Sequence, residues 1–411
     1  MIDFFSTLDG SLLPELLRYH EEAPMIFSSG LFFVLFILFL PIYGLLGLSK
    51  RTATLRIIYV VLFSLFFYYK SSGFYVLLLL LATTSDFLIA QALSHTPQGS
   101  PNRKRWVALS MIINLGILSY FKYFNFLLDL IVQAIAGIGG LMGMETASSL
   151  QWEPWDIFLP VGISFYTFQT MSYIADVYRG DIKPLKRWID YLFYVSFFPQ
   201  LVAGPIVRAK DFIPQIHRRP WVTRGEFGRG LFLILLGLFK KAVISDYISL
   251  NFVDRIFDAP TLYSGLENLM AVYGYALQIY CDFSGYSDMA IGIALFLGFR
   301  FNKNFDVPYT STNITEFWRR WHISLSTWLK DYLYIPLGGN RKGRIRTYIN
   351  LIITMLLGGL WHGAALRFIL WGGMHGIALA IHKVWCTLFY PAHKRRIKRN
   401  GIGKAIGGII T

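Results

Sequence analysis

The sequence contains little charge and almost no cysteine, and each shortage excludes a class of protein. Only 15% of the 411 residues are charged, against about 25% in a typical soluble domain. The two cysteines, Cys281 and Cys386, form no CxxC pair, so we expect neither a disulfide framework nor a thiolate metal site. The N-terminus has no basic region of the kind that opens a cleavable signal peptide. We therefore expect the first apolar span to act as its own signal.

Apolar and aromatic residues are abundant instead, at 55% and 17% of the chain, and the mean hydropathy is +0.47. Residues 26–48 and 74–93 approach or exceed the roughly 20 residues that cross about 30 Å of hydrocarbon. The sequence thus predicts an all-α, polytopic membrane protein with one domain, 1–411. Further apolar stretches lie at about 55–69, 106–121, 124–143, 157–175, 189–207, 230–246, 268–281, 286–299, 347–361 and 364–385.

The net charge of +15 indicates orientation better than nucleic-acid binding. Lys50, Arg51 and Arg56 follow the first span, residues 103–105 follow the third, and an acidic N-terminus precedes the first. Basic residues prefer cytoplasmic loops, so we expect an extracytoplasmic N-terminus and a multi-pass chain in a bacterial inner membrane. Membrane lipids with anionic headgroups are the expected partners of this charge, and nucleic acid is not.

Two segments are too polar or too broken for simple spans. Residues 197–216 contain Pro199, Gly204, Pro205 and Pro214, which predict a re-entrant, interfacial or broken helix. A second segment places Asp282 and Asp288 at the mouth of an apolar helix, before a polar loop over 300–317. Broken backbone at membrane depth is tolerated only where protein or a water-filled cavity covers it, so we expect such cover for residues 197–216.

The stretch WRRWHISLSTWLKDYLYIPLGG, residues 318–339, concentrates charge between tryptophans. Asn313 and Glu316 have the spacing of a helix cap, so we expect one amphipathic helix from that point. His322 borders the apolar face of this helix and points away from bulk water. The apolar face itself consists of Trp318, Trp321, Leu325 and Trp328.

Position separates the eight histidines. His362 lies in an apolar segment between Gly358, Gly359, Gly363 and two alanines, and ionisable groups inside a membrane are functional candidates by default. We expect function for His362 and, less strongly, for His322. His375 and His382 are expected to pack or line a rim, and the surface histidines are expected to be His20, His95, His217 and His393.

Several kinds of chemistry were open to such histidines. Zinc requires three or four ligands, and no third ligand is apparent, so no metal site is predicted. A serine hydrolase requires a GxSxG elbow, which FSGYSDMAIG does not supply. Haem stays a rival, because His362 and His375 are thirteen residues apart on one apolar stretch, but it needs a matching pair on a second helix. A general base, one neutral imidazole that removes a proton from a hydroxyl, fits the residues best.

The paired motifs WRRWHISLSTWLKDYLYIPLGGNR (318–341) and GGLWHGAALRFILWGGMHG (358–376) resemble the membrane-bound O-acyltransferase family, in a bacterial branch. YFKYFNF (120–126), FFPQLVAGPIVR (197–208) and CDFSGYSDMAIGIALFLGFRFNKNFDVPY (281–309) resemble other segments of that family. The similarity covers about residues 110–385. It implies a ring of transmembrane helices with re-entrant or interfacial helices around a central funnel.

The resemblance also implies roles for particular residues. His362 corresponds to the family's catalytic histidine, which deprotonates an acceptor hydroxyl that attacks an acyl thioester, and His322 to the second histidine. The donor would be acyl-CoA, most simply acetyl-CoA, or an acyl-phosphopantetheine carrier, with no tightly bound cofactor. Residues 340–346 either meet its phosphates or only anchor the chain. The candidates for lining the funnel are Trp321, Trp361, Asp282, Asn304, Asn313, Arg319 and Arg320.

The predicted function is transfer of an acyl group, most simply acetyl, from the cytoplasmic side toward hydroxyls of an exported polysaccharide or of an extracytoplasmic partner protein. A transporter or flippase that moves an acylated or lipid-linked carrier without chemistry is the alternative. Residues 394–411 read as a basic loop leading into another helix. Because relatives commonly continue beyond this point, we expect the chain to be naturally short or truncated.

Overall fold

A computed structural model describes residues 18–21, 24–142, 150 and 152–389. These residues form α-helices with short 3₁₀- and π-helical turns and no strand, which confirms the all-α prediction. The chain divides into two units, one formed by residues up to Val107 together with Phe168–Asn304, the other by Ala108–Thr167 together with the residues from Phe305 onward. The predictions for the acidic N-terminus and for residues 394–411 lie outside the described residues. The prediction of one domain stays a prediction.

The first unit begins with α2 (Gly30–Gly47), α3 (Ala53–Ser72) and α4 (Val76–His95), and α9 (Trp188–Ser196) packs on both α3 and α4. Aromatic rings fill the space between these helices. The fully buried ring of Phe198 lies at their centre. It contacts Phe32, Phe36, Phe39, Phe63 and Phe67.

The predicted break after residue 197 is confirmed. α10 (Phe198–Leu201) ends within one turn, and helix resumes only at α11 (Ala209–Ile216). A Cβ at Gly204 would lie 2.5 Å from the carbonyl oxygen of Pro199, so glycine permits the close approach of this loop. Pro214 lies inside α11, where its missing backbone N–H removes one helical hydrogen bond without ending the helix. Entry of this segment into a membrane stays a prediction.

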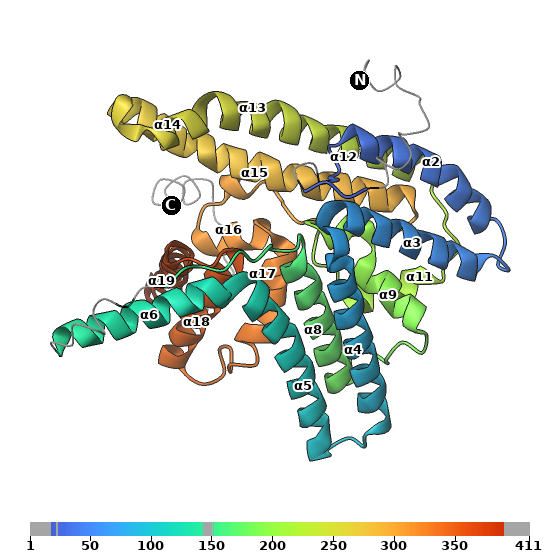
Figure 1. Ribbon diagram of the computed structural model, residues 1–411, viewed down its shortest axis with the longest axis horizontal. Coiled ribbons are helices and arrows are strands. Elements are labelled where there is room, and N and C mark those ends of the chain that lie inside the picture. Colours follow the sequence, from blue (N-terminus) through green and yellow to red (C-terminus); the bar gives the residue numbers. More distant parts are fainter. Residues whose placement is uncertain (1–17, 22–23, 143–149, 151, 390–411) are drawn as a thin grey trace. The chain divides into compact units, whose positions relative to one another are not determined.

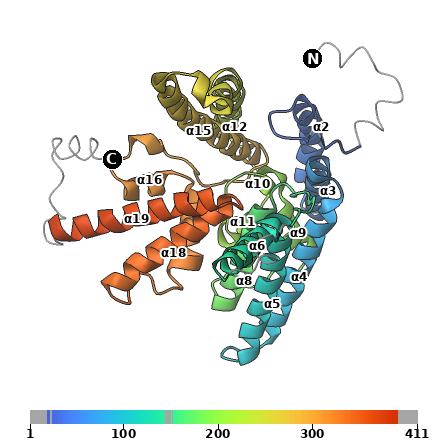
Figure 2. The same cartoon turned by 60° about the vertical axis from the view of Figure 1, so that its left-hand side comes forward.

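A long antiparallel hairpin forms the rest of the first unit (Figures 1 and 2). α12 (Arg224–Leu238) continues through π-helical turns, α13 (Asp246–Ile248) and α14 (Asp254–Asp258), and packs against α15 (Gly265–Phe296). The backbones approach closely at two pairs of glycines. A Cβ at Gly237 would lie 2.5 Å from Gly285 O, and one at Gly292 would lie 2.6 Å from Gly230 O.

The prediction that Asp282 and Asp288 sit at the mouth of a helix was wrong. Both lie within α15, which is one helix of 32 residues. Asp282 pairs with Lys241 at 2.5 Å, and Asp288 pairs with Lys240 at 2.7 Å. These lysines come from the neighbouring helix of the hairpin, so the carboxylates find charged partners within the helix pair and α15 continues through them.

The second unit contains α6 (Phe124–Leu141) and the C-terminal hairpin of α18 (Arg344–His362) and α19 (Leu366–Phe389). α5 (Pro101–Leu118) and α8 (Ile163–Arg179) run from one unit into the other along the chain. Figure 2 shows α18 and α19 side by side. Small residues allow the two backbones to approach closely, because a Cβ at Gly359 would lie 2.2 Å from Phe368 O and one at Gly372 2.2 Å from Met355 O.

The single amphipathic helix predicted after Asn313 was wrong. The structure has two short helices, α16 (Ile314–Arg320) and α17 (Ile323–Leu329), separated at Trp321 and His322. The predicted cap is present, since Asn313 Oδ1 accepts a hydrogen bond of 2.9 Å from Glu316 N. The apolar set is also buried as expected, with Trp318, Trp321, Leu325 and Trp328 each less than 10% exposed.

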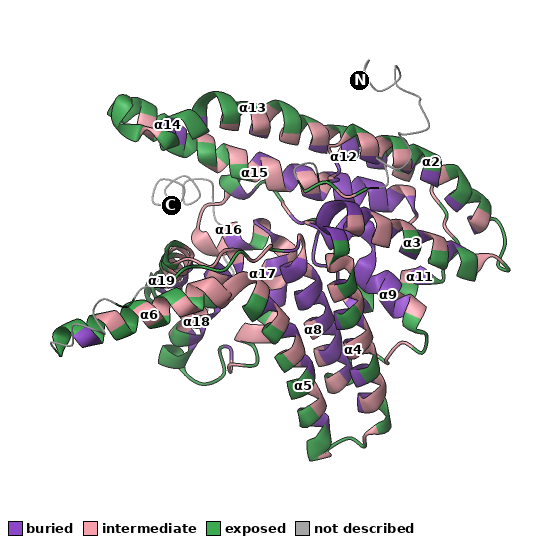
Figure 3. Ribbon diagram, viewed as in Figure 1, coloured by how far each residue is buried: buried purple, intermediate pink, exposed green. Residues whose placement is uncertain are grey.

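Among the described residues, three helical stretches are long and apolar enough to cross a membrane by length and composition: Gly30–Gly47, Ala53–His95 and Pro101–Leu141. Outward-facing apolar side chains support a membrane location, because large exposed apolar faces are rare on soluble monomers. The outer face of the α12–α14 arm is largely exposed (Figure 3). Its exposed residues include Leu231, Phe232, Leu235, Phe239, Val243, Tyr247 and Leu250.

Candidate active site

The two histidines singled out by the motifs lie against the same indole in the second unit. The ring centroid of Trp361 is 4.9 Å from that of His362 and 6.0 Å from that of His322. His362 is the last residue of α18, and His322 stands between α16 and α17. Residues forty positions apart in sequence thus meet at one side chain. His322, His362 and Trp361, which the sequence named as separate candidates, lie together in the structure, and their roles stay predictions.

The surroundings of the two imidazoles differ. His322 is 0% exposed, and its Nδ1 lies 3.4 Å from Ser324 Oγ. His362 is half-buried, and its ring has no hydrogen-bond partner among the described residues. The two imidazoles therefore differ in burial, with His322 fully enclosed by the protein and His362 less so.

A third histidine extends the aromatic cluster. The ring of Trp371 lies 5.2 Å from that of His362 and 4.7 Å from that of His375, and Trp318 lies 5.2 Å from His375. His362 and His375 therefore belong to successive helices, α18 and α19, with the chain turning between them. The two histidines are thirteen residues apart as predicted, but the turn between α18 and α19 removes the spacing argument for haem, which needs both on one helix. His375 packs among aromatic rings, as expected.

The backbone of His322 has a conformation that few side chains adopt. Its φ of 42° and ψ of 56° lie in the left-handed region, where a residue other than glycine costs roughly 1–2 kcal/mol. The rest of the fold holds this conformation, since His322 O accepts a 2.9 Å hydrogen bond from Ser326 N and the ring is fully buried. Strain of this kind concentrates at functional sites.

Two substitutions at this position separate backbone from side chain. His322→Gly and His322→Ala both remove the imidazole, but only glycine relieves the left-handed strain. We expect the unfolding free energy of His322→Gly to exceed that of His322→Ala by about 1 kcal/mol. The glycine variant should therefore unfold at a higher temperature. Thermal unfolding of the two detergent-solubilised variants measures the difference. Equal stability, or greater stability of the alanine variant, would contradict the assignment of strain to this residue.

Two residues that the sequence did not predict hold the end of α18. Lys122 Nζ donates to Trp361 O, and Tyr123 OH donates to Leu360 O at 2.9 Å. Both come from the π-helical turn Ser119–Tyr123, within the YFKYFNF segment. A charged residue in an apolar stretch was the available signal, because lysine is rare at such positions.

The remaining predicted residues of the second unit lie in α16 or at its two ends. Arg320 Nη2 pairs with Glu316 Oε1 at 2.8 Å, and Arg320 Nη1 donates to Thr310 Oγ1 at 3.1 Å. Arg319 is exposed, and Trp321 stacks on Phe317 with 5.6 Å between ring centroids. Asn313 serves as the cap described above. These contacts show that Arg320 and Asn313 stabilise α16 and its ends. That any of these residues lines a funnel stays a prediction.

Two predicted residues, Asp282 and Asn304, belong to the first unit. Asp282 is bound to Lys241 as described, with its side chain 49% exposed. Asn304 is 1% exposed, and its Nδ2 donates to Ser287 Oγ at 3.0 Å. Asn304 therefore fixes the start of the polar loop to α15. The structure does not place either residue relative to the histidines.

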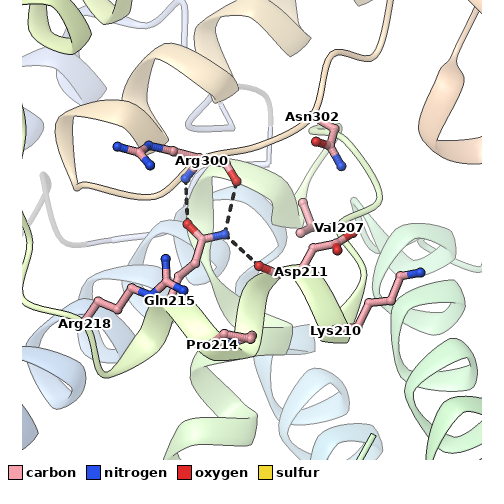
Figure 4. A pocket seen from close by; sticks show the side chains of 8 residues that line it. All are labelled: Val207, Lys210, Asp211, Pro214, Gln215, Arg218, Arg300 and Asn302. Carbon is pink, nitrogen blue, oxygen red and sulfur yellow. Dashed lines mark hydrogen bonds between the residues drawn. The ribbon is translucent and has the colours of Figure 1, made fainter. Parts of the chain in front are cut away.

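The first unit has a separate open pocket of about 380 Å³ beside α11 (Figure 4). Gln215 holds one wall, since its side chain accepts from Arg300 N at 2.9 Å and donates to Arg300 O at 3.2 Å. The guanidinium of Arg300 is already paired with Glu226, at 2.8 and 2.5 Å. No residue predicted for the site lines this pocket. Its lining consists of Val207, Lys210, Asp211, Pro214, Gln215, Arg218, Arg300 and Asn302.

Helices with apolar outer faces, together with two histidines around one indole, define a membrane protein with a candidate acid–base site. A model of the MBOAT, membrane-bound O-acyltransferase family, matches residues 185–406, which is more than half of the chain. The protein belongs to this family. The resemblance inferred from the motifs is confirmed.

Named relatives add detail at the level of similarity. The chain is 43% identical over 360 residues to a probable alginate O-acetylase of Pseudomonas syringae pv. tomato, covering 87% of this chain and 66% of that protein. It is 37% identical over 395 residues to a peptidoglycan O-acetyltransferase of Helicobacter pylori, covering 88% and 71%. A teichoic acid D-alanyltransferase of Bacillus subtilis is 31% identical over 252 residues, covering 58% and 61%. The chain thus spans about two thirds of the length of these relatives.

Proposed function

We propose that this protein transfers an acyl group, most simply acetyl, from a thioester donor on the cytoplasmic side to a hydroxyl group. The final acceptor would be an exported polysaccharide, reached directly or through an extracytoplasmic partner protein. Two relatives named for O-acetylation, of alginate and of peptidoglycan, support acetyl as the group. The observation that carries the proposal is the meeting of both motif histidines at Trp361.

His362 would act as the general base. Its imidazole takes the proton of the acceptor hydroxyl as the hydroxyl oxygen attacks the thioester carbonyl carbon. The carbon–sulfur bond then breaks, and the leaving thiolate takes the proton from the imidazolium, so that an ester and a free thiol result. Two features support this role: the half-buried ring can meet a substrate, and within the described residues no hydrogen bond occupies its nitrogens.

His322 would act beside His362 and not in place of it. Because its ring is fully buried against Trp361, we propose that it positions the donor or polarises the thioester carbonyl. The left-handed backbone at His322 supports a functional reason for placing an imidazole there. Both histidines would then serve one acyl transfer, with the proton accepted only at His362.

The proposal includes an orientation and a path. Basic residues after the first span favour a cytoplasmic position for that loop and an N-terminus outside, in a bacterial inner membrane. A funnel within a ring of helices would lead the donor, acyl-CoA or an acyl-phosphopantetheine carrier, to the histidines. Residues 340–346 are largely exposed and basic, which suits the phosphates of either donor.

Ester content of the surface polysaccharide tests this function in the cell. Strains that carry the wild-type protein or His362→Ala at matched membrane levels are compared by base-released acetate from purified polysaccharide. We expect the esters to disappear in the variant strain while the protein still inserts. Esters at the wild-type level would contradict the role of His362 and favour the alternative hypothesis of a transporter.

A further inference from the structure

Lys122 is a charged residue in an unusual place. It lies within Pro101–Leu141, one of the stretches apolar enough to cross a membrane, and its side chain is partly buried. In the described part of the chain no carboxylate pairs with it. A charge at such a position is costly and is kept mainly where it serves function.

The ammonium group of Lys122 is held by the end of α18. Besides the hydrogen bond to Trp361 O, Nζ lies 3.2 Å from Ser164 Oγ and 5.6 Å from the centre of the Trp361 ring. Tyr123, the next residue, donates its hydroxyl to Leu360 O. Consecutive side chains of one π-helical turn therefore bind consecutive carbonyls, those of the two residues before His362.

Helix physics explains what these bonds do. The last four carbonyls of an α-helix have no partner within the helix, and a cation near them is favourable because the C-terminus carries partial negative charge. The chain leaves α18 immediately after His362, since Gly363 is extended. Without an external cap the last turn would fray, and the imidazole of His362 would lose its fixed position. π-helical turns are frequently found at functional sites.

We propose that Lys122 and Tyr123 are positioning residues for acyl transfer: they cap the C-terminus of α18 and thereby fix the imidazole of His362. The inference rests on the proposed function for its catalytic consequence. Its structural core, a capped last turn, stands on the hydrogen bonds alone. Neither residue touches the reacting atoms in this account.

Kinetics of purified protein in lipid nanodiscs test the catalytic consequence. Lys122→Met removes the charge and the donor, Lys122→Arg keeps both, and Tyr123→Phe deletes one hydroxyl. Misplacement of a catalytic group by about 1 Å can cost about 10²-fold, so we expect kcat for Lys122→Met to fall by that order with the donor KM unchanged. Tyr123→Phe should lose less, and Lys122→Arg should recover most of the loss. The exposed lysine variant Lys186→Met serves as the control.

Hydrogen exchange of the peptide over residues 356–363 tests positioning without any activity. We expect faster exchange in Lys122→Met and Tyr123→Phe than in the wild type and Lys186→Met, because the last turn of α18 frays. Unchanged exchange overturns the inference whatever the activity. If wild type transfers acyl groups and Lys122→Met retains its kcat, the catalytic consequence is overturned. If wild type transfers none, the proposed function fails, and exchange alone decides the capping role.

Discussion

Gly372→Ala is expected to destabilise the C-terminal hairpin, whereas Gly373→Ala, one residue further on, is expected to be neutral or slightly stabilising. A Cβ at Gly372 would lie 2.2 Å from Met355 O and 3.0 Å from Gly359 Cα, both backbone atoms of α18. At Gly373 the nearest atom is 3.2 Å away and belongs to the end of the Leu356 side chain, which can move. The two variants gain the same helix propensity, so only the close approach differs.

The expected cost at Gly372 is roughly 3 kcal/mol, the upper end of the range for overpacked cores. Thermal unfolding in detergent, followed by the amount of monodisperse protein after heating, measures both variants against wild type. Because α18 carries His362, we also expect Gly372→Ala to lose more activity than stability alone explains. Equal stability of the two alanine variants would contradict the close packing of α18 and α19.

His362→Ala is expected to lower the rate of acyl transfer by about 10²–10⁴, the usual contribution of a general base. The reason is that a hydroxyl has to lose its proton as it attacks, and of the two imidazoles that meet Trp361 only that of His362 is not fully buried. We expect His322→Ala to lose less in kcat and to affect donor binding as well, because a buried imidazole polarises or positions without accepting the proton.

Steady-state kinetics of both variants at matched amounts of folded protein separate these roles. His95→Ala is the control, since His95 is an exposed histidine that bonds to Gln91 O within its own helix. No role in acyl transfer is predicted for it. A loss at His322 as large as that at His362, with unchanged KM, would instead indicate that the two rings share the proton transfer.

The sequence predicted the all-α class and named His322 and His362 as candidate site residues. Apolar composition and motifs are local features that do not depend on how the helices are arranged. It did not predict the break at His322. Residues 314–329 contain neither glycine nor proline, so local propensity favours one continuous helix. Burial of the imidazole against Trp361 offsets the left-handed backbone only in the folded protein, and no local pattern reports such tertiary compensation.

The same reason explains two other differences. Asp282 and Asp288 suggested a helix start because carboxylates are costly inside apolar helices, but their partners Lys240 and Lys241 lie on a neighbouring helix. Likewise, Lys122 received no role from the sequence because the carbonyl that it binds, that of Trp361, is 239 residues away. Long-range partners decide whether a charge in an apolar segment marks an end, a pair or a cap.

Thioester turnover by the purified protein tests the central claim most directly. The full chain in nanodiscs is supplied with acetyl-CoA and a soluble hydroxyl acceptor, and thiol release and ester formation are measured together. The account predicts equal amounts of thiol and ester with wild type and neither above background with His362→Ala. A folded wild-type protein that binds the donor but releases no thiol would contradict acyl transfer, and the chain would then move its substrate without chemistry.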